Sequence, residues 1–166
     1  MIKLNLGCGQ HPMEGFINID AIKKNGTDVV MDVTKLEYPD NYADEIHAYH
    51  LCEHFYVWEV VDILKDWRRV LKPGGKLVVE MPDIRKGAIN FLQAITTKNP
   101  DVAIRLGLWA FYGEAEYKNP LMSHKWGWWP ESFATALQMA GFNSINEEDP
   151  QTHQKLVRDF RMEAIK

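Results

Sequence analysis

The first third of the chain alternates short apolar runs with polar turns, a pattern typical of β-strands. Strands are predicted at Ile2 to Leu6, Phe16 to Ile19, Asp28 to Asp32 and Ala43 to Tyr49. The connection between the first two strands, Gly7 to Gly15, is only nine residues long. A crossover between parallel strands usually needs a dozen or more residues that include a helix. We therefore expect the helix of this crossover to be reduced to a turn or absent.

The clearest helical pattern starts at Glu53 or His54 and ends at Leu71, with apolar residues at steps of three and four. Pro73-Gly74-Gly75 is a strong signal for the end of a helix. The apolar run from Lys76 to Met81 then predicts a buried strand. This stretch is therefore expected to form a right-handed βαβ unit.

The second half of the chain mixes helical periodicity with an irregular aromatic stretch, Gly113 to Trp129. Helices are predicted at Ile84 to Thr97, Pro100 to Tyr112 and Pro130 to Ala140. Two last strands are predicted at Phe142 to Ile145 and Lys155 to Arg161. They are separated by the turn signal Asp149-Pro150 and could pair as an antiparallel hairpin.

About seven strands, with helices between the later ones, predict an α/β fold built on a doubly wound sheet. At 166 residues the chain is expected to form a single domain over 1–166. Residues 84–129 are expected to be a helical and aromatic insertion in that domain.

Charge and composition narrow the class of protein. The net charge of −4, without a basic block, argues against nucleic acid as the main partner. No apolar stretch approaches the roughly 18 residues that span a membrane, and no signal peptide is recognisable. The two cysteines, Cys8 and Cys52, form no CxxC pair and fit a reducing compartment, so we expect a cytoplasmic protein.

Two features at the ends of predicted strands indicate a nucleoside-containing cofactor. Gly7-Cys8-Gly9 follows the first strand, and glycine lets a backbone turn sharply or approach a ligand closely. Asp20 ends the second strand, where a carboxylate can accept hydrogen bonds from ribose hydroxyls. A nicotinamide site would have a third glycine and a longer step to the acid, which counts against that cofactor.

Together with Asp32 and the stretch Arg69-Val70-Leu71-Lys72-Pro73-Gly74-Gly75-Lys76-Leu77, these features resemble the class I S-adenosylmethionine (SAM)-dependent methyltransferases. The resemblance covers residues 1–82 and, more loosely, 126–163. It implies a Rossmann-like seven-stranded sheet that is mostly parallel and ends in an antiparallel C-terminal hairpin. It also implies an enzyme that uses SAM and releases S-adenosylhomocysteine.

The resemblance places the cofactor along the ends of the strands. The glycine turn would approach the methionine part of SAM, Asp20 would hold the ribose, and Asp32 with the Val33 backbone would lie at the adenine edge. His50 and Leu51 would lie near the sulfonium. The implied cofactor-binding residues are Leu6, Gly7, Cys8, Gly9, Asp20, Ala21, Asp32, Val33, His50 and Leu51.

The acceptor side is assigned to the insertion, because many family members cover the site with N-terminal helices and the first strand begins here at residue 2. Substrate contacts are expected from His54, Tyr112, Trp126 and Trp128, although aromatic clusters are also common in cores. The catalytic residues are expected to be His50 and His124, one of which would serve as a general base if the acceptor needs one. The expected acceptor is a small molecule or a sugar-containing compound, and the aromatic segment could equally be a homodimer interface.

Two alternatives remain open. The segment His50-Leu51-Cys52-Glu53-His54 spells the H-x-x-E-H motif of a zinc hydrolase, with Glu131 as a further ligand. Because His50 ends an apparent strand, the two histidines would straddle a strand–helix junction, and no metal is expected. The other alternative is a catalytically silent member that binds SAM or serves as a partner subunit.

Overall fold

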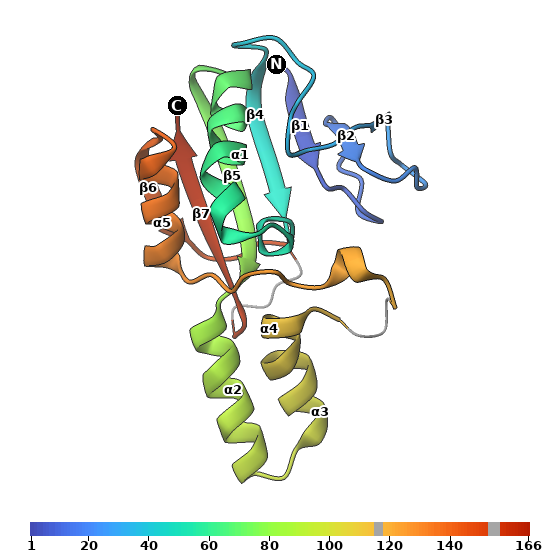
Figure 1. Ribbon diagram of the computed structural model, residues 1–166, viewed down its shortest axis with the longest axis vertical. Helices are drawn as coiled ribbons and strands as arrows, with labels where there is room; N and C mark the ends of the chain where they lie inside the picture. The colour runs from blue at the N-terminus through green and yellow to red at the C-terminus, as the bar shows by residue number, and fades with distance from the viewer. Residues whose placement is uncertain (115–117, 153–156) are drawn as a thin grey trace.

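The computed structural model describes residues 1–114, 118–152 and 157–166 and builds them around one seven-stranded sheet (Figure 1). The strand order is β3-β2-β1-β4-β5-β7-β6, in which β7 is antiparallel to both of its neighbours and the remaining pairs are parallel. The predicted, mostly parallel sheet with an antiparallel C-terminal hairpin is therefore confirmed. The strands are β1 (Lys3–Leu6), β2 (Ile17–Asp20), β3 (Val29–Val30), β4 (Ala43–Tyr49), β5 (Leu71–Pro82), β6 (Asn143–Glu148) and β7 (Asp159–Ile165).

The starts of two strands differ most from the prediction. Strand β7 begins at Asp159, later than the predicted Lys155, which itself lies outside the described residues. Strand β5 begins at Leu71 and includes the Pro-Gly-Gly stretch. The pairing with β4 jumps from Ala43↔Leu71 to Glu45↔Lys76, so this stretch forms a large bulge inside the strand, with Gly74 at φ +75°.

The crossover from β1 to β2 contains no helix, as predicted. Buried amide side chains hold it instead. The Nδ2 of Asn5 donates to Asn18 Oδ1 (2.9 Å) and to the carbonyl of His11 (3.3 Å), and the Met13 N–H donates to Asn18 Oδ1 (2.7 Å). These bonds satisfy polar groups that a helix would otherwise satisfy internally.

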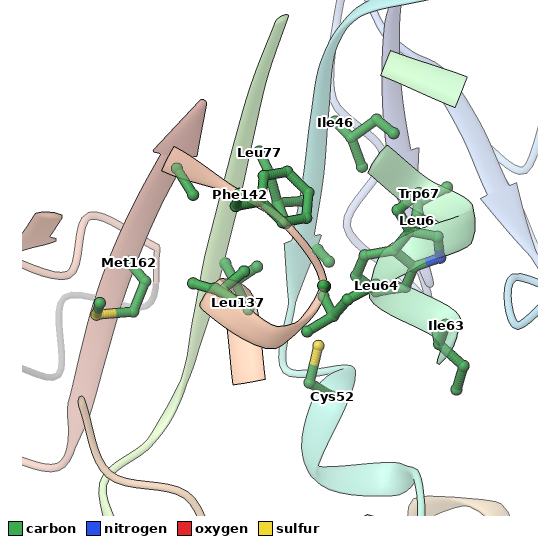
Figure 2. Packing of buried hydrophobic residues seen from close by; sticks show 14 of the residues in the cluster. Leu6, Ile46, Cys52, Ile63, Leu64, Trp67, Leu77, Leu137, Phe142 and Met162 are labelled. Atoms are coloured by element: carbon green, nitrogen blue, oxygen red, sulfur yellow. The ribbon is translucent and has the colours of Figure 1, made fainter. Parts of the chain in front are cut away.

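Helices α1 (Val57–Val70) and α5 (Pro130–Met139) lie side by side on one face of the sheet (Figure 1). Their apolar side chains interdigitate with those of the strands, and Figure 2 shows Trp67, Leu64 and Leu137 in this core. Helix α1 begins later than predicted, because Cys52–His54 forms a separate 3₁₀ turn, η1. The Glu59 side chain then accepts the Tyr56 N–H at the start of α1.

The opposite face of the sheet carries a ladder of charged side chains. Connections 7–16, 21–28 and 31–42 contain no helix that could cover this face. Across the strands, Lys3 pairs with Glu45 (2.8 Å) and Arg161 pairs with Glu80 (2.9 Å). Charged groups on a sheet face are stable only when they are paired or solvated, and this pairing supplies that condition.

A helical arm extends beyond the carboxyl end of β5 (Figure 1). It consists of α2 (Ile84–Thr96), α3 (Pro100–Val102), the π-helix η2 (Ala103–Leu108) and α4 (Trp109–Tyr112), close to the predicted helices. The two sides of the arm approach closely at two glycines: a Cβ on Gly87 would lie 2.6 Å from Ala110 Cβ, and one on Gly107 would lie 2.8 Å from Phe91 Cβ.

After the 3₁₀ turn η4 (Pro120–Met122), the chain returns to the sheet and docks on η1. The Lys125 N–H donates to the Glu53 carbonyl (2.7 Å), and the Ile84 N–H donates to the Trp128 carbonyl (3.0 Å). None of the helices in the described residues is long and apolar enough to cross a bilayer.

Candidate functional site

A cleft opens at the carboxyl ends of β1 and β4, where ligands bind in open α/β sheets. One wall is the glycine turn Gly7-Cys8-Gly9, and the floor includes His50 at the end of β4. The other wall comes from η1, which contributes Glu53 and His54, and from residues 123–129, the returning segment, which contribute His124. The expectation that the insertion covers the site thus has a structural counterpart in the returning segment.

The glycine turn depends on the absence of side chains. Gly7 and Gly9 have φ values of +64° and +55°, and a Cβ on Gly7 would lie 2.7 Å from Leu51 Cδ1. The Asp20 carboxylate accepts the Gly9 N–H (2.8 Å) and so ties the turn to the tip of β2. Between the glycines, burial raises the pKa of the Cys8 thiol, which suits a packing role rather than a nucleophile.

The other predicted cofactor residues follow the same edge of the sheet. Asp32 is exposed, and its Oδ1 accepts the Thr34 N–H (2.9 Å) and hydroxyl (2.7 Å). The carbonyl of Val33 accepts the indole N–H of Trp67 (2.7 Å), which fixes the backbone next to Asp32. Two further predicted cofactor residues differ in exposure: Ala21 is exposed, and Leu6 is fully buried.

His50 lies between two carboxylates. Its Nδ1 is 3.3 Å from Glu53 Oε1, and its Nε2 is 3.4 Å from Asp159 Oδ2. Burial lowers the pKa of His50, but the nearby carboxylates of Asp159 and Glu53 outweigh burial and raise that pKa to about 9. His50 is therefore a cation at neutral pH and can donate hydrogen bonds but cannot accept a further proton.

His124 has the opposite charge state. Burial lowers its pKa, and the attraction of Glu53 offsets this only in part, so the ring is neutral at neutral pH. Its Nδ1 contacts the Ala110 carbonyl (3.1 Å), and its Nε2 lies 3.9 Å from Glu53 Oε1. A carbonyl can only accept, so Nδ1 carries the proton and Nε2 is free to accept one.

Glu53 connects the imidazoles. Its side chain is 3% exposed, and burial alone would raise its pKa. The positive His50, whose Nδ1 is 3.3 Å from Glu53 Oε1, instead lowers the pKa of Glu53 to about 2. The carboxylate is thus ionised in a buried position.

The structure places the predicted substrate residues unequally. His54 lines the cleft, and its Nδ1 contacts the Ser123 carbonyl (3.2 Å). The side chains of Tyr112 and Trp126 are exposed and do not line the cleft. Trp128 belongs to the core, where it packs against Phe133 and donates its indole N–H to the Cys52 carbonyl (3.4 Å).

Sequence reasoning considered Glu53 only through the H-x-x-E-H motif, and it missed Arg158 and Asp159 as parts of the site. Asp159 is fully buried at the start of β7, where Arg158 holds its carboxylate (2.6 Å). A signal was present, since an Arg-Asp pair lies inside the predicted strand Lys155 to Arg161. Periodicity alone did not indicate that this pair would face His50.

The geometry of an H-x-x-E-H zinc hydrolase is not formed. His50 ends β4 with φ +49°, whereas His54 lies on η1, so the two histidines do not share a helical face. Glu131, the further ligand that was considered, is exposed and pairs with Arg85 (2.8 Å).

Comparisons with known proteins agree with this geometry. Residues 4–79 match the family model of the methyltransferase domain. No curated protein sequence matches the chain.

Solved structures of 410 chains match this one, and three of them illustrate the shared fold. A SAM-dependent methyltransferase from Archaeoglobus fulgidus is 19% identical, with a TM-score of 0.65 over 99% of this chain and 85% of that one. The 1,6-didemethyltoxoflavin-N1-methyltransferase of Burkholderia thailandensis, bound to its substrate and S-adenosylhomocysteine, is 10% identical, with a TM-score of 0.66 over 99% and 70%. A Haloferax volcanii complex of the Trm112 methyltransferase activator and a methyltransferase is 10% identical, with a TM-score of 0.63 over 99% and 81%.

Proposed function

We propose that this chain, a member of the class I SAM-dependent methyltransferases whose cofactor is SAM, methylates a small-molecule or sugar-containing acceptor. The observation that carries the proposal is the cleft itself. A left-handed glycine turn tied to Asp20 forms one wall, and a returning segment with a neutral imidazole forms the other.

The residues present fit SAM. The turn leaves open the space that side chains at Gly7 and Gly9 would take, so backbone can approach the methionine part. The Asp20 carboxylate retains lone pairs for the ribose hydroxyls beyond those used by Gly9 and Ile22. Asp32 and the fixed Val33 backbone would lie at the adenine edge.

When bound, SAM supplies a methyl group on a positively charged sulfur: an electron pair of the acceptor forms the new bond to the methyl carbon, and the sulfur keeps the pair of the broken bond. The chain's part is to hold the two reactants in line and to manage the acceptor's proton. His50, a hydrogen-bond donor at neutral pH, suits holding a bound molecule in place rather than accepting its proton. His124 is therefore the imidazole through which the acceptor would be activated.

A small acceptor suits this cleft, which is lined by Met122, His124 and the buried carboxylate of Glu53. The acidic net charge of −4 disfavours a nucleic acid acceptor. The free cysteines Cys8 and Cys52 support a cytoplasmic location. The homodimer stays a prediction.

Binding of SAM tests the proposal first. Isothermal titration of the purified protein with SAM and with S-adenosylhomocysteine should give micromolar dissociation constants. Asp20→Ala should weaken binding by about 1–3 kcal/mol, because bound hydroxyls lose their acceptor. The exposed Asp62→Ala on α1 is the matched control and should bind as the wild type does.

Turnover then separates the enzyme from a silent member. Formation of S-adenosylhomocysteine with a panel of hydroxyl and amine acceptors supports the proposal. Binding without turnover on any acceptor would favour the silent SAM-binding protein, and no binding at all would reject the SAM site.

A further inference from the structure

Three potential metal ligands converge on the acceptor side of the cleft. Glu53, His54 and His124 each offer one ligand atom, and these atoms lie within 4.8 Å of one another. Glu53 and His54 come from η1, whereas His124 comes from the returning segment. The main-chain bond from Lys125 to Glu53 holds the two segments together at this point (2.7 Å).

The Glu53 carboxylate is incompletely satisfied. Neither of its oxygens makes a hydrogen bond of acceptable geometry with any described residue. The nearest positive group is His50 Nδ1 at 3.3 Å. Buried carboxylates in folded proteins normally accept several hydrogen bonds or bind a cation, so this arrangement leaves a place for one.

The two histidines are prepared as ligands. The Nδ1 of His54 contacts the Ser123 carbonyl (3.2 Å), and that of His124 contacts the Ala110 carbonyl (3.1 Å). A carbonyl can only accept, so each Nδ1 carries a proton, and Nε2 is the nitrogen that can bind a metal ion. A second N–H bonded to a main-chain carbonyl is the usual support of a metal-bound histidine.

The spacing of two of these atoms also fits a cation. His124 Nε2 and Glu53 Oε1 are 3.9 Å apart. The separation suits two ligands of one ion, because zinc–ligand bonds are about 2.0–2.2 Å long.

We propose that Glu53, His54 and His124 bind a divalent transition-metal ion, for which Zn²⁺ is the best match. Two imidazoles and one carboxylate are a ligand set of catalytic zinc sites that keep a fourth position open. Here that position would face the cleft. This differs from the H-x-x-E-H arrangement, because His50 is held by Asp159 and the third ligand is His124.

The ion defines an acceptor class, and this part rests on the proposed function. A hydroxyl or thiol bound to the ion would lose its proton to solvent more readily, and its electron pair would form the new bond to the methyl carbon while the sulfur of SAM keeps the pair of the broken bond. The acceptor would therefore carry a hydroxyl or a thiol. Metal binding itself does not depend on methyl transfer.

The test is binding of Zn²⁺ to protein stripped with a chelator. Isothermal titration with a zinc salt should give about one ion per chain, and Co²⁺ should give the visible absorption of a four-coordinate site. Glu53→Gln and His54→Ala should each weaken binding by more than the roughly 10- to 100-fold that loss of a supporting residue costs. His11→Ala, which removes a cleft-lining imidazole outside the cluster, should leave zinc affinity unchanged.

His54 is partly exposed, so its variant should fold even if the buried Glu53→Gln does not; circular dichroism checks both. The absence of zinc binding by the wild-type protein would overturn the site. Zinc affinity equal to that of the wild type in folded Glu53→Gln or His54→Ala would also overturn it. Full methyl-transfer activity after metal removal would show that the acceptor is activated without an ion, and this would overturn the proposed role of the metal in the reaction. Titration of the metal-free protein with SAM tests the methyltransferase assignment separately.

Discussion

At the scale of the residue, three histidines of this protein have three different environments that set their charge. His50 is buried but lies between two carboxylates, so its pKa rises to about 9. His124 is buried beside one more distant carboxylate, and burial lowers its pKa. His47 is buried on the polar face of the sheet, where burial also lowers its pKa. The number of nearby carboxylates, set against nearby cations, decides whether burial is overcome, because His47 has one carboxylate and two cations, Arg161 and Lys76, near it.

His47 makes the stability of the fold depend on pH. Its Nε2 lies 2.6 Å from Glu45 Oε1, and its Nδ1 contacts the Tyr49 hydroxyl, while Arg161 and Lys76 on neighbouring strands further disfavour a positive ring. Its folded pKa is below the ordinary 6.5, so the unfolded chain takes up the proton first. The contribution to stability is full above pH 6.5 and is lost as the pH falls through the folded pKa.

Denaturant unfolding at pH 7.5 and 5.5 tests this. The free energy of unfolding of the wild type should fall more between the two pH values than that of His47→Gln. The shifts from other groups, such as His50, are common to both proteins and cancel in the comparison. Equal pH dependence of wild type and variant would contradict the assignment.

At the scale of the element, α1 anchors both the core and the cofactor edge. Trp67 is fully buried on this helix, next to Leu64 and Leu6 in Figure 2. Its indole N–H donates to the Val33 carbonyl (2.7 Å), which would otherwise be a buried acceptor without a partner. The helix thereby fixes the backbone that is expected at the adenine edge.

Trp67→Phe should keep most of the packing but lose that bond. We expect the free energy of unfolding in urea to fall by about 1–3 kcal/mol, the cost of an unsatisfied buried group. Trp58→Phe on the same helix, with a side chain 72% exposed, is the control and should change stability by less than about 0.5 kcal/mol. Equal effects of the two substitutions would show that the hydrogen bond has no special role.

At the scale of the whole molecule, the arm and the sheet should differ in local stability. The arm packs mainly on itself, and its outer surface exposes Ile89, Leu92 and Ile95. Its base is tied to the sheet, where Asn90 Nδ2 donates to the Val157 carbonyl (2.9 Å). Local opening needs less free energy where fewer buried contacts must break.

Hydrogen exchange followed by mass spectrometry should therefore show a gradient. Amides near residues 95–103, at the far end of the arm, should exchange fastest. Amides near 84–88 should be intermediate, and those of β4 and β5 slowest. Equal protection across the arm and the central strands would show that both unfold as one unit.

The sequence by itself determined the elements and the position of the glycine turn and Asp20 at one edge of the sheet. The strands, the helices and the absence of a helix between β1 and β2 follow from local periodicity and chain length. Gly7, Gly9 and Asp20 could be placed because parallel strands end at one edge of a sheet. The Pro-Gly-Gly bulge was misjudged as a boundary, because a local turn signal does not show whether pairing resumes on the same strand.

The tertiary structure alone decided the side of the cleft opposite the glycine turn. It buried Glu53, which a local pattern would place on a helix surface. It also brought His124 to Glu53, and Asp159 to His50, from distant segments. Trp128 went to the core for the same reason. Burial and charge pairing depend on which segments meet across the sheet's edge, and no local pattern of residues records that meeting. The ionic states of His50 and His124, and the geometry of the proposed metal site, therefore come from packing.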